Sequence, residues 1–368
     1  MTHLHYTAMG AQGKQLHGTR APPCSPVVHI SRPHRVRTCA ASGTSLVQAQ
    51  DMMELGKSGL RVPVMGVGAW SWGDRSGYWG YGREYGKEES RQAYKALLEA
   101  GLTFIDTAEV YGFGDSENFL GMFLLLQIAT KFAPLPWRLT AGSVPTAAKA
   151  SLERLGMAKM SLYMQHWPGF FFNTFSNDAY LEGLASVKNT GLADAIGVSN
   201  FNAQRVRHAS KVLAKSGVPL ASNQVQYSLL YRAPERNGVL EACREAGTTL
   251  VAYSPLCQGL LTGKYKVGGS KPYGARAPLF NDSRLREVQP LLSCMQAISE
   301  ARGKTLAQIA LNWTVCKGAL PIPGAKNAKQ LQDIAGALGW RLTDAEVAEL
   351  DAVSGKIPTS LGAPFENW

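Results

Sequence analysis

Four polar side chains end three short apolar runs, and together they could deliver a proton to a carbonyl oxygen. Asp106 and Tyr111 follow one run, Lys131 ends the second, and His166 ends the third. A phenol with a pKa near ~10 is a weak acid, but an adjacent ammonium group stabilises its ionised form. A carboxylate can hold that ammonium group charged, and an imidazole can orient the carbonyl. The set therefore predicts a reductase.

Each of these residues also has an ordinary structural interpretation. Taken alone, Tyr111 fits a rim aromatic, Lys131 a solvated charge, Asp106 a cap and His166 a hydrogen-bonded core residue. Their occurrence together at successive strand ends favours the catalytic interpretation, because the strand tips of a parallel α/β barrel lie on one face.

Short apolar runs alternate with helical patterns from about residue 60 onwards. The expected strands are 64–69, 103–107, 128–131, 162–166, 194–198, 221–226, 250–253 and 320–322. The expected helices are 87–100, 144–155, 178–188, 203–215, 236–246, 307–316 and 328–338, with a last helix opened by the capping box at 343–346. Parallel strands need crossover helices, so we predict the α/β class and a (β/α)8 TIM barrel. The alternative is a doubly wound open sheet, although no Gly-x-Gly-x-x-Gly follows the first strand.

The charge of +11 is concentrated at the N-terminus. Residues 1–50 contain five Lys or Arg and no Asp or Glu, and without them the net charge is about +6. No dense basic run or nucleic-acid motif follows, so no nucleic-acid partner is predicted. Residues 1–50 are predicted to be a disordered transit peptide for the chloroplast, with a mitochondrial or cytoplasmic location as alternatives. Residues 51–355 would form the single catalytic domain and 356–368 a C-terminal tail.

Neither a membrane span nor a metal site is predicted. No run reaches the roughly 20 apolar residues that a transmembrane helix needs. The cysteines are widely scattered, without the spacing of a metal site or a redox pair. The sequence gives no indication of the oligomeric state.

Longer passages resemble the aldo-keto reductase superfamily, and most closely its plant and algal plastid branch. The matching passages are 101–112, 128–131, 162–168, 197–202, 223–227, 251–256 and 321–326, and that branch also carries the Ala-Pro-Leu-Pro-Trp-Arg stretch at 133–138. The resemblance implies a barrel that binds NADPH without a Rossmann motif. It implies reduction of aldehydes, with ketones as a further class, by an enzyme of the alcohol dehydrogenase (NADP+) type. Tyr111 would donate the proton, Lys131 and Asp106 would tune the acidity of Tyr111, and His166 would orient the carbonyl.

The resemblance also assigns a cofactor site. Ser199, Asn200 and Gln224 match positions at the nicotinamide carboxamide, and Tyr253 matches the aromatic that stacks on the ring. The remaining matches are Ser254, Pro255, Leu256, Gln258, Gly259 and Lys264 around the pyrophosphate, and Gly324, Lys326, Gln330 and Asp333 at the adenosine end. Lys326 at a helix N-terminus is suited to a 2′-phosphate, which favours NADPH over NADH. Each of these residues could instead be a turn glycine, a surface lysine or a core tyrosine.

A small carbonyl compound is the expected substrate. Ala69, Trp70, Trp72 and Trp167, with the loop 170–175, are predicted to wall the pocket. Such walls favour a planar or apolar aldehyde over a sugar phosphate. Alternatively, the tryptophans only close the barrel mouth.

Three features depart from the family pattern, and one of them is the basic leader, which has no counterpart in cytosolic members. The connection 121–127 is several residues shorter than in relatives, which leaves the aim of Lys131 open, and Ile334 replaces an asparagine that usually contacts adenine. Two alternatives to an enzyme remain. One is a cofactor-binding regulatory subunit without significant turnover, and the other is a degenerate protein that neither binds the cofactor nor converts a substrate.

Overall fold

Eight parallel strands form the centre of the protein. The computed structural model describes residues 46–122, 126–273 and 276–358, so the predicted transit peptide up to residue 45 and the tail from 359 lie outside them. The strands pair in chain order. They are β3 (Val67–Gly68), β4 (Phe104–Asp106), β5 (Gln127–Phe132), β6 (Met160–Gln165), β7 (Ala193–Ser199), β8 (Leu220–Gln226), β9 (Thr249–Tyr253) and β10 (Leu320–Pro321).

The sheet closes on itself between its first and last strands. Gly68 bridges to Gly324 in parallel, and the N–H groups of Gly66 and Gly68 donate to the carbonyls of Pro321 and Pro323 at 3.0 Å. Because proline has no N–H, this seam uses only its carbonyl oxygens. The predicted (β/α)8 barrel is confirmed, and the open sheet is excluded.

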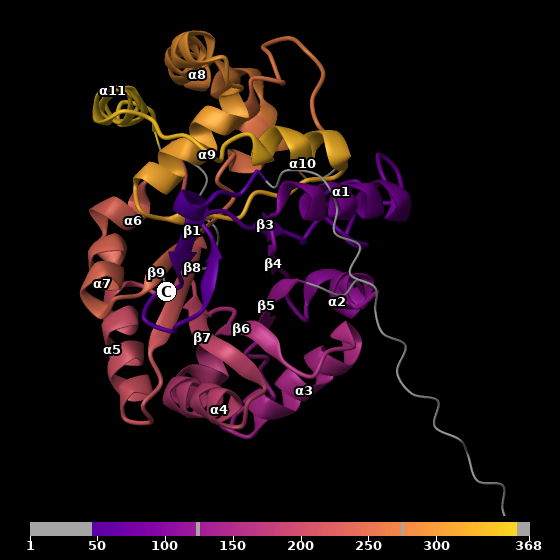
Figure 1. The fold of residues 1–368 in the computed structure, drawn as a ribbon, viewed down its shortest axis with the longest axis vertical. Helices are drawn as coiled ribbons and strands as arrows, with labels where there is room; N and C mark the ends of the chain where they lie inside the picture. Colours follow the sequence, from indigo (N-terminus) through magenta and orange to yellow (C-terminus); the bar gives the residue numbers. More distant parts are fainter. Residues whose placement is uncertain (1–45, 123–125, 274–275, 359–368) are drawn as a thin grey trace, which may run out of the picture. The chain divides into compact units, whose positions relative to one another are not determined.

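Helices cover the outside of the strands (Figure 1). They are α1 (Lys87–Ala100), α2 (Asp115–Leu120), α3 (Ser143–Leu155), α4 (Asn177–Asn189), α5 (Ala203–Ala214), α6 (Ala233–Arg236), α7 (Val239–Ala246), α8 (Asp282–Arg302), α9 (Leu306–Cys316), α10 (Ala328–Ala335) and α11 (Asp344–Ser354). The capping box predicted before α11 forms between Thr343 and Glu346. The helix predicted at 236–246 is split, because Gly238 has a φ of 79° and cannot continue a helix. No helix of these described ranges is both long and apolar enough to cross a membrane.

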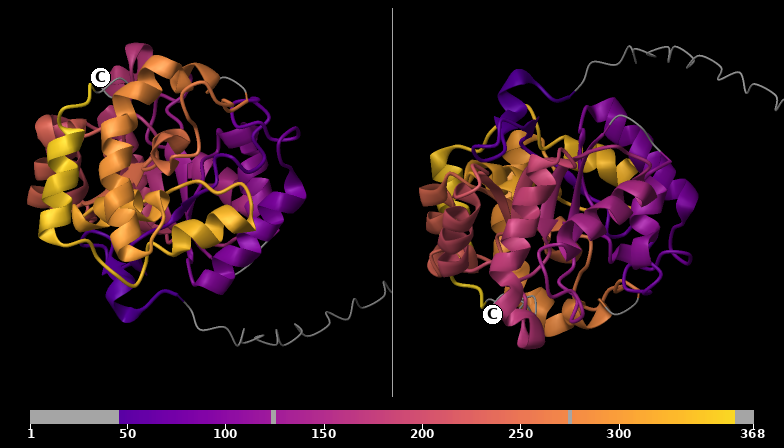
Figure 2. Two further views of the ribbon diagram at one scale, coloured as in Figure 1. Left: turned by 90° about the horizontal axis from the view of Figure 1, so that it is seen from above. Right: turned by 90° about the horizontal axis from the view of Figure 1, so that it is seen from below.

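The long helix α8 was not predicted. It lies beside α11, as the left view of Figure 2 shows in orange and yellow. Pro290 inside it argues against a helix at the sequence level. Its buried face could nevertheless have been found from the three- and four-residue spacing of its apolar residues, which are Leu285, Val288, Leu291, Leu292, Met295 and Ile298.

A β-hairpin that the sequence analysis missed closes the N-terminal end of the barrel. Its strands are β1 (Met52–Glu54) and β2 (Arg61–Pro63). Leu55 and Val62 are fully buried in one cluster with residues from inside the barrel, among them Phe104, Ala129 and Leu162. The Gly56 N–H donates to Thr249 Oγ1 at 2.8 Å. A Cβ on Gly56 would lie 2.5 Å from the Ala221 carbonyl oxygen, so only glycine permits this approach.

We expect Leu55→Ala to lower the free energy of unfolding by about 2–5 kcal/mol, because it leaves a void in the barrel floor. Urea unfolding measures the change. The matched variant Leu139→Ala removes a half-exposed leucine and should cost less than about 1 kcal/mol. Equal losses in the two variants would show that the hairpin does not pack the floor as described.

Candidate active site

A large cavity of about 1090 Å³ opens at the carboxyl ends of the strands, where a barrel of this kind carries its site. Its lining includes Asp106, Tyr111 and His166, which come from the ends of β4 and β6. The volume is at or above the upper end of typical small-molecule pockets, about 300–1,000 Å³. The cavity can therefore hold a large cofactor together with a small substrate.

The innermost polar group is a buried ion pair between Lys131 and Asp106. Lys131 has no exposed surface, and its Nζ donates to Asp106 Oδ1 at 2.6 Å and to the Thr107 carbonyl at 2.8 Å. The third donor of Nζ points to the Tyr111 hydroxyl at 3.3 Å. Gln224 Nε2 donates to the other oxygen of Asp106 at 2.8 Å. The ammonium group thus has a partner for each of its three hydrogens.

Burial acts on the pKa of each member of this pair. It raises the pKa of Asp106, against the opposing attraction of Lys131 and the hydrogen bond from Gln224. It lowers the pKa of Lys131, against the opposing attraction of Asp106. Since either charge alone would be costly in this interior, the two depend on each other.

Tyr111 and His166 lie next to each other in the lining of the cavity. Burial, reinforced by the charge of Asp106, holds the pKa of the Tyr111 phenol well above its usual value. Burial and the positive charge of Lys131 hold the pKa of His166 well below its usual value. At neutral pH the site therefore contains a protonated phenol and a neutral imidazole, with ring centroids 5.7 Å apart in an edge-on arrangement.

The short connection before β5 does not misdirect Lys131. Residues 123–125 lie outside the described part, and α2 is indeed only six residues long. β5 is nevertheless in register with both neighbours, pairing Ile128 with Ile105 and Lys131 with Met164. The open question about the aim of Lys131 is therefore answered by its contacts with Asp106 and Tyr111.

All fourteen residues predicted to hold a cofactor line the same cavity. Near the catalytic end, Ser199 Oγ donates to the Gln224 carbonyl at 2.8 Å and Asn200 Nδ2 donates to the His166 carbonyl at 3.0 Å. The Tyr253 hydroxyl donates to Asn200 Oδ1 at 3.1 Å. Ile334 also lines the cavity, at the opposite end of the predicted set.

Lys326, predicted to meet a 2′-phosphate, has protein partners in this structure. Its Nζ donates to the Trp79 carbonyl at 2.5 Å and to Glu84 Oε2 at 2.9 Å. Burial lowers the pKa of Lys326, and the hydrogen bond to Glu84 opposes that effect. An anionic ligand at Lys326 would therefore compete with a carboxylate.

Two loops contribute cavity-lining residues that were not named individually from the sequence. One follows β3 and contributes Tyr78 and Trp79, and the other follows β9 and contributes Arg276. The Tyr78 hydroxyl donates to Gln258 Oε1 at 2.7 Å. Arg276 lies 4.7 Å from the Trp79 ring centroid and donates to the Gln258 carbonyl at 3.1 Å. The aromatic run around Trp79 and the Lys- and Arg-containing stretch after β9 were the available signals.

Two of the four predicted pocket-wall residues are misassigned. Trp70 and Trp167 line the cavity, and Trp70 stacks on Tyr111 with centroids 5.7 Å apart. Ala69 and Trp72 are fully buried and do not line it. Trp72 instead donates to the Ala325 carbonyl at 2.6 Å and packs on Phe119, because its side chain points into the layer behind the barrel.

The loop 170–175 does not wall the cavity either. None of its residues contributes to the lining. Phe171, Phe172 and Phe175 point into solvent and are 73, 88 and 95 % exposed. Asn173 is buried instead and donates to the Pro134 carbonyl at 2.7 Å, which fixes the loop against the segment after β5.

Non-glycine residues with left-handed backbone are concentrated at the cavity end of the barrel. In the part of the chain that the structure describes, every non-glycine residue with positive φ follows a strand's carboxyl end: Phe113, Phe171, Asn200, Ser254, Cys257 and Gln258. Such conformations cost of order 1–3 kcal/mol each and are typical of functional sites. No group of His, Cys, Asp or Glu within the described ranges is arranged to hold a metal ion.

The cavity fits a phosphate-bearing dinucleotide. Four cationic side chains line it away from the catalytic end: Lys264, Lys271, Arg276 and Lys326. Arg276 is buried, and its Nε has no hydrogen-bond partner among the described residues. A buried guanidinium group with a spare donor is suited to phosphate oxygens. A (β/α)8 barrel with such a channel leading to a phenol, an ammonium group, a carboxylate and an imidazole defines a class of dinucleotide-dependent oxidoreductases.

Comparison with known proteins identifies the family. Residues 64–354 match the model of the Aldo/keto reductase family, and the chain belongs to this family. It is 38 % identical to the chloroplastic pyridoxal reductase of Arabidopsis thaliana over 317 residues, covering 82 % of this chain and 86 % of that protein. The family uses NADP(H), so the chain is an NADP(H)-dependent oxidoreductase and the predicted cofactor is confirmed.

Solved structures agree with this assignment. A thermostable aldo-keto reductase in complex with the inhibitor epalrestat is 30 % identical, with a TM-score of 0.64, covering 82 % of this chain and 99 % of that one. An aldo-keto reductase from Klebsiella pneumoniae in complex with NADPH is 26 % identical, with a TM-score of 0.63, covering 83 % and 95 %.

We expect Arg276→Met to weaken NADPH binding about 10- to 100-fold, because it removes charged donors from the channel. Quenching of protein fluorescence by NADPH measures the dissociation constant. Arg75→Met is the matched control, since Arg75 is largely exposed and pairs with Asp115 on the surface. If the two variants bound NADPH equally well, Arg276 would not be a contact of the NADPH phosphates.

Proposed function

We propose that this protein is an aldehyde reductase of the alcohol dehydrogenase (NADP+) type, with ketones as further substrates. The observation that carries the proposal is the contact of one buried ammonium group, Lys131 Nζ, with both Asp106 and the Tyr111 hydroxyl beneath the cavity. This arrangement lets a phenol give up its proton beside a charge that stabilises the phenolate.

NADPH, when bound, supplies the hydride. In the proposed mechanism the Tyr111 hydroxyl donates its proton to the substrate oxygen as negative charge develops there. Lys131 stabilises the resulting phenolate through its N–H donor, and Asp106 keeps the ammonium group in place. His166 remains neutral and presents one ring N–H, which orients the carbonyl oxygen toward the phenol.

The cofactor residues take the roles that the resemblance implies. Ser199, Asn200 and Gln224 would bind the carboxamide, and Tyr253 would support the nicotinamide ring. The loop from Ser254 to Lys264 would hold the pyrophosphate, together with Arg276. Lys326 would meet the 2′-phosphate after releasing Glu84. The lining of the cavity and its cationic side chains support this arrangement.

The proposed substrate class is planar aromatic aldehydes, with pyridoxal as the first candidate. Trp70, Tyr111 and Trp167 present flat apolar faces at the catalytic end of the cavity. The similarity to a pyridoxal reductase supports the same class. Oxidation of NADPH should be followed with pyridoxal, 4-nitrobenzaldehyde and methylglyoxal. Binding of NADPH without turnover of any of these would instead support a regulatory subunit.

We further propose that the protein acts in the chloroplast. Residues 1–50 would be the transit peptide, followed by the catalytic domain at 51–355 and a tail at 356–368. The acid-free leader and the chloroplastic location in the name of the Arabidopsis relative support this. A fluorescent fusion that stays outside plastids would contradict it.

We expect Tyr111→Phe to lower kcat about 10²- to 10⁴-fold, because the substrate oxygen loses its proton donor. NADPH affinity should stay within about twofold, since the ring and its stacking on Trp70 are retained. Single-turnover kinetics and fluorescence quenching separate the two quantities. A variant that retains kcat would exclude Tyr111 as the acid.

The raised pKa of Tyr111 predicts opposite pH dependences for the two directions. Reduction needs the protonated phenol, so kcat should stay flat through neutral pH and fall only above about 10. Oxidation of the alcohol needs the phenolate, so its rate should rise with pH over the same alkaline range. Steady-state profiles in both directions test this. A decline in reduction centred near pH 7 would contradict it.

A further inference from the structure

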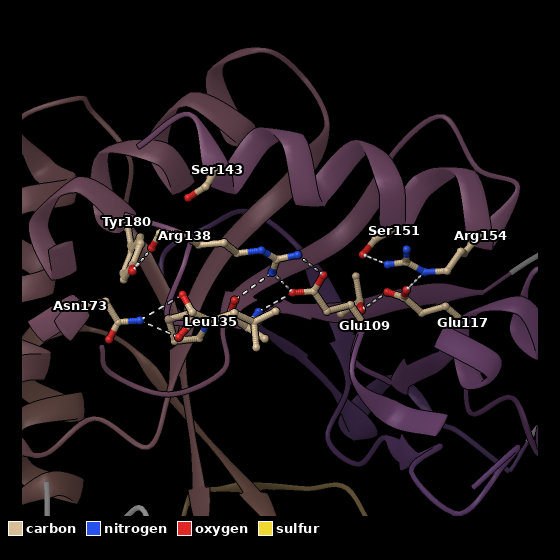
Figure 3. Close-up of polar contacts among 12 residues, drawn as sticks. Glu109, Glu117, Leu135, Arg138, Ser143, Ser151, Arg154, Asn173 and Tyr180 are labelled. Carbon is tan, nitrogen blue, oxygen red and sulfur yellow. Dashed lines mark hydrogen bonds and ion pairs between the residues drawn. The ribbon is translucent and has the colours of Figure 1, made fainter. Parts of the chain in front are cut away.

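The Ala-Pro-Leu-Pro-Trp-Arg stretch that follows Phe132 is not part of the cavity. None of residues 133–138 lines it, although they begin only two positions after the buried lysine. Figure 3 shows that the stretch lies in a network of charged and polar side chains between β5, α3 and α4. Its contacts indicate what it holds in place.

Glu109 connects this stretch to the loop that carries Tyr111. The Glu109 carboxylate is two residues before the phenol, and its side chain is 8 % exposed. Its Oε1 accepts from the Ala133 N–H at 2.6 Å. Arg138 donates to both carboxylate oxygens, the second at 3.0 Å, and also to the Ala133 carbonyl at 2.8 Å. One carboxylate therefore joins the loop after β4 to the end of β5.

A second carboxylate fixes the same strand one residue before the lysine. Glu117 of α2 has no exposed surface, and its Oε1 accepts from Thr130 Oγ1 at 2.5 Å (Figure 3). Its Oε2 accepts from Arg154 of α3 at 2.6 Å. Because neighbouring strand residues point to opposite faces, Thr130 contacts Glu117 outside the barrel while Lys131 points inward.

Residues 133–138 are also fixed on the side that faces away from Glu109. Asn173 donates to the Pro134 carbonyl at 2.7 Å, and the Tyr180 hydroxyl donates to the Arg138 carbonyl. Arg138 itself lies 5.2 Å from the Phe132 ring centroid. Arg138 is thus fixed at its carbonyl by Tyr180, at the face of its guanidinium group by Phe132, and at its N–H donors by Glu109 and Ala133. Because Arg138 is fixed, the carboxylate of Glu109 that it binds is fixed as well.

The hydrogen bond between Lys131 and Tyr111, which this network positions, would be lost after a small displacement. Lys131 Nζ lies 3.3 Å from the Tyr111 oxygen, just beyond the usual 2.7–3.2 Å range of an N–H···O hydrogen bond. Asp106 and Lys131 sit on paired strands, but Tyr111 sits five residues beyond Asp106 in a loop. A small outward movement of that loop would break the contact, and the only anionic side chain within it is Glu109.

We propose that Glu109, with Arg138 as its partner, is a positioning residue that sets the distance between Tyr111 and Lys131. The pair touches neither the cavity nor the reacting groups. It acts by holding the Tyr111 loop against the end of the lysine strand. This also explains how Lys131 keeps its aim despite the short connection before β5. The inference rests on the proposed function.

The test compares Glu109→Gln and Arg138→Met with the full-length wild-type protein. Glutamine keeps an acceptor for Ala133 but loses the charge that Arg138 needs. We expect kcat to fall about 10- to 100-fold, because a displacement of about 1 Å can cost this much. NADPH affinity should stay within about twofold. Double substitution should cost little more than either single one, since both remove the same contact.

The pH profile of alcohol oxidation separates positioning from general destabilisation. With Lys131 farther away, the Tyr111 phenol becomes less acidic, so the alkaline limb should move to higher pH in both variants. Arg138→Lys, which keeps a positive charge, should recover part of kcat and of the shift. If Glu109→Gln folds poorly, Arg138→Met gives the same readouts from the more exposed partner.

Glu346→Gln is the matched control. Glu346 accepts two donors from Arg302 between α8 and α11, away from the cavity. Its loss should lower stability and leave kcat and the pH profile unchanged. The inference is overturned if Glu109→Gln keeps the wild-type kcat and profile, or behaves as Glu346→Gln does. A wild-type protein that binds NADPH but reduces no carbonyl would instead remove the proposed function, and the inference with it.

Discussion

The ion pair between Lys131 and Asp106 is the constraint on which the site depends. A lysine with no exposed surface is tolerated only if every N–H finds a partner, and here a carboxylate, a carbonyl and a phenol supply them. That requirement fixes the register of β4 against β5 and draws the Tyr111 loop inward. The same burial keeps the phenol protonated and the imidazole neutral, and the charges of Asp106 and Lys131 shift the two pKa values in the same directions as burial does.

Much of this was predictable, because regular elements leave a periodic signal. The bounds of α1 were predicted to the residue, since its apolar face is clear and Gly101 ends it with left-handed backbone. The gathering of Asp106, Tyr111, Lys131 and His166 followed from a general property of parallel barrels. These predictions needed only the order of the strands and the identity of the residue at each tip.

The features that could not be predicted lie in irregular segments, where apolar residues do not recur at the spacing of a helix or a strand. Trp70 and Trp72 follow a strand of two residues, so nothing in the sequence says that one faces the cavity and the other the core. The closeness of Glu84 to Lys326 joins positions 242 residues apart and depends on two irregular loops. Similarly, the hairpin at 52–63 is too short to be recognised before the barrel that it closes is known.

The hairpin gives the two ends of the barrel different characters. The floor is regular, apolar and tightly packed around Leu55 and Gly56, whereas the non-glycine residues with positive φ and the Asp106, Tyr111, Lys131 and His166 side chains lie at the cavity end. Heat tolerance and substrate choice are therefore governed by separate sets of positions. A lineage adapting to a warmer habitat could change the floor without altering selectivity, and a protein engineer could diversify the mouth on a scaffold reinforced from below.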